Sequence, residues 1–457
     1  MSYDVNDLDF TISLVGDVLL TRRMNVFAED GFLKLRDLLH SSHATFANLE
    51  TTVRHWDEGA PALGGLGTFM TMPPKLLGEL DWFGIEIVSC ANNHAPDFGT
   101  EGLLATIRHL DEAGIEHAGI GANLAEARAP AYLDTAAGRL AMVAVTATYR
   151  PGSEAGEQRR DMQGRPGLSA LGFDVTYTVD PQSFAELKRT AAGLGFEKEK
   201  QRSKSYYGSK DLVRDQETAE EVRIAGNRFV LGAAFSRTTT ANARHAQQMI
   251  KSIEEARRQA DIVCVSVHYH ELGGKSRLSA GSREEIDEPA EFIVDFARAA
   301  IDSGADMVVG HGPHYPLGIE IYKGRPIFYS IGNFVMQTET VRYLPDESYS
   351  RLGLPADATP ADFVDGRTDR GKKGHAAHPL YWESIVVACR FRHGKPSEIV
   401  LHPIDLGHGE PRSQKGRPIL ATGATAQRIL ERMRRLSTQY GTNIEITGET
   451  AIVSLAG

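Results

Sequence analysis

The sequence contains little cysteine. Only three cysteines occur in 457 residues, Cys90, Cys264 and Cys389, and each lies within an apolar run far from the other two. An odd number of widely spaced cysteines does not fit a disulfide framework or a thiolate zinc site. The pattern predicts buried, reduced thiols that fill the core. It therefore favours a cytoplasmic protein.

Long apolar segments and targeting signals are also missing. No stretch approaches the about 18 consecutive apolar residues expected of a transmembrane helix. The first residues, MSYDVNDLDF, are acidic and lack the basic and apolar regions of a secretory signal peptide. We therefore expect a cytoplasmic location and no membrane partner.

Positive charge is in short supply. Lysine and arginine number 50 against 60 aspartate and glutamate residues, which gives a formal net charge of −10. Sequence-independent binding to nucleic acid requires a basic face, so we expect no nucleic-acid partner. The hydrophobic content of 41% is ordinary for a globular protein with a sizeable core. The oligomeric state is left open by the sequence.

The order of the expected elements predicts an α/β fold. Between residues 10 and 145, strand-like runs such as FTISLVGD and IEIVSC alternate with amphipathic helical segments such as TEGLLATIRHLDEAG. The alternation resumes after residue 243, and this pattern is typical of layered α/β proteins. We expect one domain over residues 1–457, with a polar insertion at 150–228, a long loop at 336–379, and a helix and strand in 416–457 that pack on the core.

Potential metal ligands follow almost every strand-like run. The residues in these turns are Asp17, Asn48, Glu50, Asn92, Asn93, His94, His268, His270, Glu271, His311 and His314. In open α/β sheets the loops at the carboxyl ends of strands meet in one crevice. Carboxylate, imidazole and amide ligands without thiolates suit manganese, iron or zinc. Glu50 could also bridge two ions about 3.5–4 Å apart.

Each of these elements alone has a simpler explanation. Asp17 after a glycine is typical of an ordinary turn, and Asn92 to His94 of a helix-capping loop. His268 and His270 could form a half-buried pair on one face of a strand. The joint occurrence favours a metal site. In the stretch GHGPH, Gly312 and Pro313 would end the strand, so that His311 and His314 can turn towards one ion.

Four motifs resemble those of the CapA family. They are GDVLLTR, ANLETTV, ANNHAPDFGTEGL and GADMVVGHGPHYPLGIEIYKGRPIFYSIGNF. The family is named for bacterial poly-γ-glutamate capsule synthesis and belongs to the calcineurin-like metallophosphatase superfamily. The resemblance implies a four-layer α/β/β/α sandwich of the metallophosphatase type, with polar insertions over the site.

The resemblance also implies roles for single residues. Asp17 and His314 would bind a first metal, and Glu50 would bridge to a second. The ligands of the second metal would be Asn93, His268 and His311. His94 would be the general acid. The residues expected to contact the substrate are Arg22, Asn92 and Asn333.

The chain departs from the superfamily pattern at three places. Leu19 stands where a histidine ligand of the first metal is usual. The usual His-Pro-His is one residue longer here, as His311 to His314. The segment HYHEL moves Glu271 and adds His270, which we expect to act as a ligand or a base. The expected cofactor is therefore one or two divalent ions of manganese, iron or zinc, with manganese favoured.

Three functions fit these residues. The leading one is a metal-dependent hydrolase that cleaves an amide, peptide-like or phosphate ester bond by metal-bound hydroxide, with His94 as the acid. The second is a metal-dependent peptide epimerase, similar to lasso-peptide epimerases, that uses His94 with His270 or Glu271 at an α-carbon. The third is a non-catalytic accessory protein of polyglutamate or capsule synthesis. The expected partner is a small molecule or a peptide or polyglutamate-like substrate.

Overall fold

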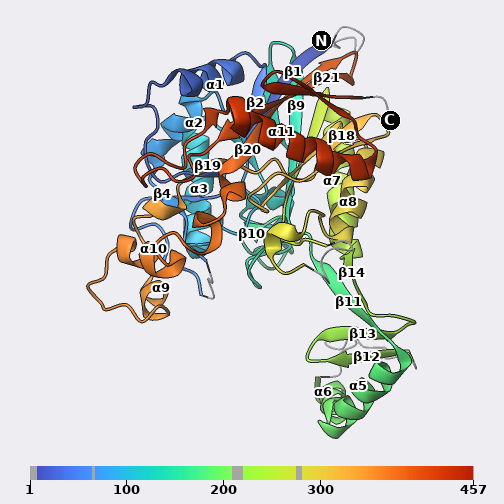
Figure 1. Cartoon of the computed structure of the whole chain (residues 1–457). Coiled ribbons are helices and arrows are strands. Elements are labelled where there is room, and N and C mark those ends of the chain that lie inside the picture. The colour runs from blue at the N-terminus through green and yellow to red at the C-terminus, as the bar shows by residue number, and fades with distance from the viewer. Residues whose placement is uncertain (1–7, 64–66, 208–219, 274–279, 456–457) are drawn as a thin grey trace. The chain divides into compact units, whose positions relative to one another are not determined.

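The chain folds into two compact units that each contain strands and helices, which confirms the predicted α/β class. The computed structural model (Figure 1) describes residues 8–63, 67–207, 220–273 and 280–455. Unit 1 comprises Met1–Leu171, Ala243–Glu271 and Phe296–Gly457. Unit 2 comprises Gly172–Asn242 and Leu272–Asp295.

The largest sheet of unit 1 has ten strands. Its main path runs β23-β24-β21-β20-β1-β2-β5-β6, while β19 also pairs with β1 and β22 with β21. Strands β1, β2, β5, β6 and β19 are parallel, and β20 joins β1 in antiparallel fashion. The bounds are β1 Asp9–Leu19, β2 Ala44–Asn48, β5 Ile87–Ser89, β6 Glu116–Ala118, β19 Asn333–Met336, β20 Glu383–Arg392, β21 Lys395–Asp405, β22 Ile419–Leu420, β23 Ile444–Thr447 and β24 Thr450–Val453.

A second sheet of unit 1 has six strands in the order β17-β18-β16-β15-β9-β8. Its central strands β9, β15 and β16 are parallel, and they are buried nearly throughout, which explains their continuous apolar sequences. The bounds are β8 Ala131–Thr135, β9 Gly138–Thr146, β15 Ile262–His268, β16 Met307–His311, β17 Ile319–Tyr322 and β18 Arg325–Phe328.

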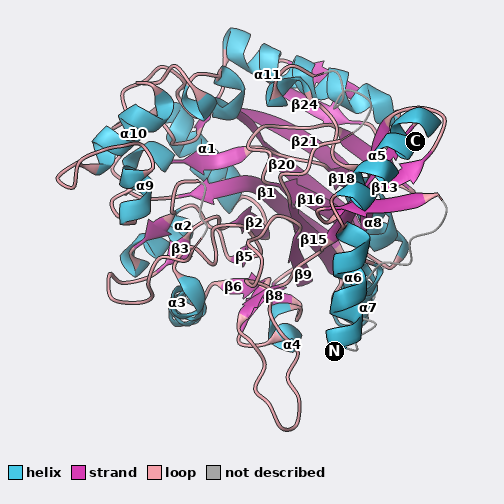
Figure 2. Ribbon diagram, turned by 90° about the horizontal axis from the view of Figure 1, so that it is seen from below, coloured by secondary structure: helices cyan, strands magenta, loops and turns pink. Residues whose placement is uncertain are grey.

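One hydrophobic core joins the two sheets of unit 1. Alternate residues of β1, Phe10, Ile12 and Leu14, belong to the same buried cluster as Met142 of β9 and Cys264 of β15. The three cysteines are free and buried, as expected from their apolar surroundings. Helices α3 (Gly99–Ala113) and α7 (Ala243–Gln259) pack on strands of the first and second sheet respectively. Figure 2 shows the strands of this unit at its centre, with α3 and α11 (Gly423–Ser437) outside them.

The segment expected to be a polar insertion at 150–228 is divided differently in the structure. Residues up to 171 belong to unit 1, and the remainder contributes to unit 2. There β11 (Phe173–Val179) pairs with β13 (Asn227–Leu231) and β14 (Ser236–Ala241), while β12 (Glu221–Ile224) pairs with β13. Helices α5 (Pro181–Gly193) and α6 (Phe196–Tyr207) complete the unit, and its small core contains Val179, Phe184, Ala191 and Val222. The apolar positions are few because the core is small, so the polar composition concealed this unit.

The expected long loop at 336–379 contains two helices, α9 (Asp346–Ser350) and α10 (Pro360–Thr368). Thr359 and Asp362 form a reciprocal capping box at the start of α10, and Pro360 occupies its first turn. Phe363 and Val364 are buried. Short helices with few apolar residues give a weak periodic signal, which explains why the sequence suggested a loop.

At the other end of the chain, α11 packs Ile429, Leu430 and Met433 into the core of unit 1, and β24 extends the first sheet. None of the helices in the described ranges has both the length and the apolar character required to cross a membrane.

Candidate metal and acid–base site

The strand registers bring the candidate ligands together. In the first sheet, Asp17 at the end of β1 lies beside Asn48 of β2 on one side and Asn333 of β19 on the other. In the second sheet, His268 at the end of β15 lies beside His311 at the end of β16. The parallel strands therefore present their polar residues at the same edge, where the loops are free and the sheet fixes their bases.

Asp17 is fully buried and is approached by several polar groups. Asn48 Nδ2 donates to its Oδ1 at 2.8 Å, and the Gly312 amide donates to its Oδ2 at 3.2 Å. His311 Nδ1 lies 3.4 Å from Oδ1, and His314 Nδ1 lies 3.3 Å from Oδ2. Burial alone would raise the pKa of Asp17, but the two imidazoles outweigh it and hold the pKa well below its usual range.

The surroundings of the Glu50 carboxylate differ from those of Asp17. Its carboxylate is fully buried, and within the described residues neither oxygen has a hydrogen-bond partner. Three imidazole nitrogens surround Oε1: the Nε2 atoms of His268 and His314 lie at 3.8 Å and that of His94 at 3.9 Å. Burial, followed by the negative charge of Asp17, raises the pKa of Glu50 well above its ordinary value. A buried carboxylate in this condition is costly unless a cation joins it.

His268 and His311 supply further nitrogen donors. His268 Nε2 contacts Asn93 Oδ1 at 2.7 Å, and burial lowers the pKa of His268 to about 3, which favours the neutral imidazole that binds metals. His311 is also fully buried, and both of its ring nitrogens are without a hydrogen-bond partner in the part of the chain that the structure describes. The ring nitrogens of His311 and the carboxylate of Glu50, which lack hydrogen bonds within the described residues, are available as ligand atoms for a cation.

The turn after β16 brings its two histidines to the same carboxylate. The strand ends at His311, and the backbone then turns through positive φ angles of 102° at Gly312 and 68° at His314. A Cβ atom at Gly312 would lie 2.4 Å from the carbonyl oxygen of Tyr269, so only glycine fits. His311 and His314 both face Asp17 as a result.

His94 belongs to an acid–base pair. Its Nδ1 lies 2.6 Å from Oδ2 of Asp97, which is buried and also accepts hydrogen bonds from the Met70 amide and from Arg150. This arrangement places a proton on Nδ1 and directs Nε2 towards Glu50. A positioned histidine with a carboxylate behind it can protonate a leaving group.

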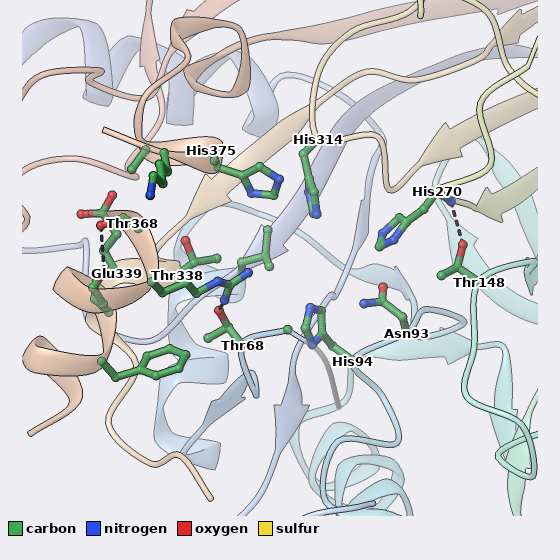
Figure 3. Close-up of a pocket in the computed structure, with 18 of the residues that line it drawn as sticks. Thr68, Asn93, His94, Thr148, His270, His314, Thr338, Glu339, Thr368 and His375 are labelled. Carbon is green, nitrogen blue, oxygen red and sulfur yellow. Dashed lines mark hydrogen bonds between the residues drawn. The ribbon is translucent and has the colours of Figure 1, made fainter. Parts of the chain in front are cut away.

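One side of a cavity of about 560 Å³ is lined by four of the predicted residues, Asn93, His94, His270 and His314. Figure 3 shows the rings of His94, His270 and His314 and the amide of Asn93 directed towards a common space. The His270 amide donates to Thr148 Oγ1 at 2.7 Å, which fixes the backbone from which this ring extends. The cavity therefore gives a substrate access to the imidazole groups.

The other eight predicted residues lie outside the lining of this cavity. Four of them, Asp17, Glu50, His268 and His311, are fully buried in the cluster described above, and the remaining four make the following contacts. Arg22 donates to the backbone carbonyls of Arg412 and Lys415. Asn92 donates to the Leu49 carbonyl and accepts from the amides of His94 and Ala95, so it holds a turn. Asn333 contacts His314 Nδ1 and donates to the His314 carbonyl. Glu271 accepts from Thr148 Oγ1 at 2.8 Å.

The donor set fits a divalent cation. Two groups with ligand atoms within 4.8 Å of one another occur here, Asp17, Glu50, His268 and Glu50, His270, His314. They share Glu50, the carboxylate that forms no hydrogen bond with any residue in the described ranges. The chemistry of the set, carboxylate and imidazole without thiolate, is that of manganese, iron or zinc sites. Leu19 is buried beside Met70 and Val341 and supplies no donor.

Sequence reasoning missed several residues that hold or surround the site. Asn48, which the sequence offered only as a potential metal ligand, donates a hydrogen bond to Asp17. Asp97 follows His94 by three residues, a spacing that allows such a pair within one turn. Arg150 and Arg367 line the cavity, and no local pattern in the sequence marks either of them.

Comparison with known proteins gives a consistent result. The model of the family described as Bacterial capsule synthesis protein PGA_cap matches residues 11–338. An uncharacterized protein of Sinorhizobium fredii is 34% identical over 455 residues, which cover 98% of this chain and 93% of that protein. A probable polyglutamine synthesis accessory protein of Mycobacterium tuberculosis is 28% identical over 297 residues, covering 64% and 56% of the two chains. The capsule biosynthesis protein CapA of Bacillus anthracis is 21% identical over 330 residues, covering 71% and 59%.

Proposed function

This chain belongs to the bacterial capsule synthesis protein family PGA_cap, and on that premise we propose that it is a metal-dependent hydrolase of amide, peptide-like or phosphate ester bonds. The observation that carries the proposal is the buried Glu50 carboxylate, which has no hydrogen-bond partner among the described residues and lies within 3.9 Å of three imidazoles. The cation would be held by Asp17, Glu50, His268, His311 and His314, with Asn93 at the edge.

A bound divalent cation would acidify a water molecule and polarise the substrate oxygen. The residues of the chain supply the remaining steps. His270, which lines the same cavity, takes up the proton that the attacking water loses. The water oxygen forms a bond to the carbonyl carbon or phosphorus, and the bond to the leaving nitrogen or oxygen breaks. His94 donates its Nε2 proton to that leaving atom, and Asp97 holds the ring through Nδ1. The carboxylates of Asp17 and Glu50 are fully buried and so are kept from bulk water.

The test is metal content together with hydrolysis. Mass spectrometry should find about one or two equivalents of transition metal per chain in protein purified without added metal, and almost none in the Asp17→Ala/His311→Ala variant. Cleavage of an aryl phosphate and a γ-glutamyl anilide should be lost with the metal. The variant His55→Ala/His109→Ala, which alters a different histidine cluster, should keep both. Hydrolysis that survives in the Asp17→Ala/His311→Ala variant contradicts the proposal.

A second candidate is a peptide epimerase. His94 and His270 both line the cavity and extend from different loops, as an acid and a base acting on opposite faces of an α-carbon would need to do. One imidazole would remove the α-proton and the other would return a proton to the opposite face. Incorporation of deuterium from D₂O into a peptide without cleavage would favour this function over hydrolysis.

A further inference from the structure

The cavity that holds the histidine cluster has a second wall, formed by residues of the 336–379 segment. Figure 3 shows Thr338, Glu339, Thr368 and His375 on the side of the cavity away from His270. The volume of about 560 Å³ is large enough for a dipeptide-sized ligand that reaches both walls. The residues of this second wall therefore contact a part of the substrate distant from the bond that reacts at the histidine cluster.

Arg367 is the central cation of this wall. It lies in the last turn of α10, and its guanidinium group donates a hydrogen bond to Thr68 Oγ1. In the described ranges no carboxylate forms an ion pair with it. Although part of the residue is exposed, desolvation of the guanidinium lowers the pKa of Arg367. Arginine has five N–H donors, so one hydrogen bond leaves most of them for a ligand.

Arg150 is the second arginine of the cavity. Its Nη2 donates to Asp97, but its Nη1 is buried and has no hydrogen-bond partner within the described residues. The guanidinium lies over the ring of Phe69, 5.0 Å from its centroid. Phe69 directly follows Thr68, the partner of Arg367, so the two guanidinium groups are anchored to adjacent residues. Both arginines line the same cavity.

The charge of the lining favours an anion. The acidic residue of the lining, Glu339, is neutralised by Lys415 at 2.7 Å and Arg412 at 3.3 Å. Arg367 has no such partner, and Lys373 pairs with Asp369 at 3.8 Å on the exposed surface, where ion pairs are weak. A carboxylate bound in this cavity would accept hydrogen bonds from the buried Nη1 of Arg150 and from the guanidinium of Arg367, which forms no ion pair within the described residues.

We propose that Arg150 and Arg367 form an anion subsite that binds a carboxylate of an acidic, peptide-like substrate while the bond to be broken lies at the histidine cluster. The position of that bond rests on the proposed function. Phe363 and Val364 precede Arg367 by four and three residues, so they share its face of α10 and can contact the methylene groups of an acidic side chain. This combination selects an acidic side chain over a free inorganic anion.

The test is calorimetric binding of two capped dipeptides to the intact protein. N-acetyl-Glu-Glu-amide and N-acetyl-Gln-Gln-amide differ only in their side-chain charge. The wild-type protein should bind the acidic dipeptide about tenfold or more tightly than the neutral one, because charge-assisted hydrogen bonds are lost in the latter. Arg367→Gln should abolish this preference, and Arg367→Lys should retain part of it. Arg342→Gln, which removes an exposed arginine of the same segment outside the cavity, should keep it.

Equal affinities in the wild-type protein would overturn the proposal, as would an unchanged preference in Arg367→Gln. Inorganic phosphate could also displace the acidic dipeptide equally well from the wild-type protein and from Arg367→Gln. That result would overturn the proposal too, since the carboxylate would then bind at a site without Arg367. The Asp17→Ala/His311→Ala variant retains both arginines and should retain the preference. Absence of metal or of hydrolysis in the wild-type protein would therefore disprove the proposed function without affecting this binding result.

Discussion

Two clusters in unit 1 combine glutamate with histidine, and the state of the carboxylate separates them. Around Glu50, three imidazole nitrogens lie at 3.8–3.9 Å, and the carboxylate forms no hydrogen bond within the described residues. Around Glu58, His109 Nε2 lies at 2.8 Å, the His55 amide donates at 2.7 Å, and Arg108 completes the set. Both clusters bring ligand atoms within 4.8 Å of one another.

The comparison teaches that residue type and proximity do not define a metal site. The hydrogen bonds from protein donors lower the pKa of Glu58 to about 2 against the effect of its partial burial, so this carboxylate is stable as an anion without a metal. Glu50 is buried, and this burial together with the negative charge of Asp17 raises its pKa. A cation completes the Glu50 cluster, whereas at Glu58 it would have to displace existing partners. The Glu58 cluster instead joins α3 to a loop about 50 residues earlier in the chain, through His109 and Arg108.

The largest difference between the clusters should appear in catalysis. We expect His94→Gln and Asp97→Asn to lower kcat by about 10²–10⁴-fold, because each removes positioned proton transfer. The matched change His109→Gln, in the other cluster, should leave kcat within a factor of about two. Steady-state rates with metal content measured in parallel provide the check. A rate in His94→Gln equal to that of the wild type would remove His94 from the mechanism.

The second-largest expected effect is that added metal stabilises the fold through the Glu50 cluster and not through the Glu58 cluster. Manganese or zinc at 100 times its dissociation constant should raise the free energy of unfolding by about 2.7 kcal/mol, because the folded state alone binds the ion. This increase should disappear in Asp17→Ala/His311→Ala and persist in Glu58→Gln. Thermal unfolding with and without a chelator measures the effect. A stabilisation that depends on Glu58 would show that the second cluster is the metal site.

In metal-free protein the two glutamates should respond oppositely to the same substitution. Glu50→Gln should stabilise the fold at neutral pH by about 1–3 kcal/mol, because it removes a buried acid without partners. The raised pKa of Glu50 means that folding takes up a proton, so the penalty grows as pH rises above about 4.5. Glu58→Gln should destabilise by about 1 kcal/mol or less, since its partners are partly exposed. Chemical unfolding at neutral pH measures the change in the free energy of unfolding for each variant. If both substitutions stabilised the fold, or both destabilised it, the comparison would be contradicted.

The smallest expected effect is the acid response of Glu58. Its folded pKa of about 2 lies below the ordinary value of 4.5, so its contribution is present above about 4.5 and is lost as pH falls towards 2. The stability difference between the wild type and Glu58→Gln should therefore shrink across this interval. Unfolding curves at several acidic pH values, with the same ionic strength, test this, and a constant difference would show that folding does not lower the pKa of Glu58.

Much of the candidate site could be read from the sequence because its ligands follow apolar strands. The sequence predicts that His311 and His314 turn towards one ion; in the structure both lie near Asp17, and the ion itself stays a prediction. Unit 2 was missed because its four buried core residues are too few to produce a periodic signal. Arg22 resembled a substrate ligand by its position in a motif, but its guanidinium binds backbone carbonyls of a segment about 390 residues further along the chain. Contacts between residues so far apart in the chain produce no pattern in the local sequence.

The sequence by itself determined the α/β class, the order of the strands that carry the ligands and the chemical type of the ligands, because these depend on local periodicity and on residue identity. The tertiary structure alone decided which carboxylate lacks hydrogen bonds, which histidine is held by Asp97, and which arginines share the cavity with the histidine cluster. These properties depend on burial and on the relative positions of segments distant in the chain. Two clusters with similar residues, Glu50 and Glu58 with their histidines, therefore acquire different chemistry from their surroundings.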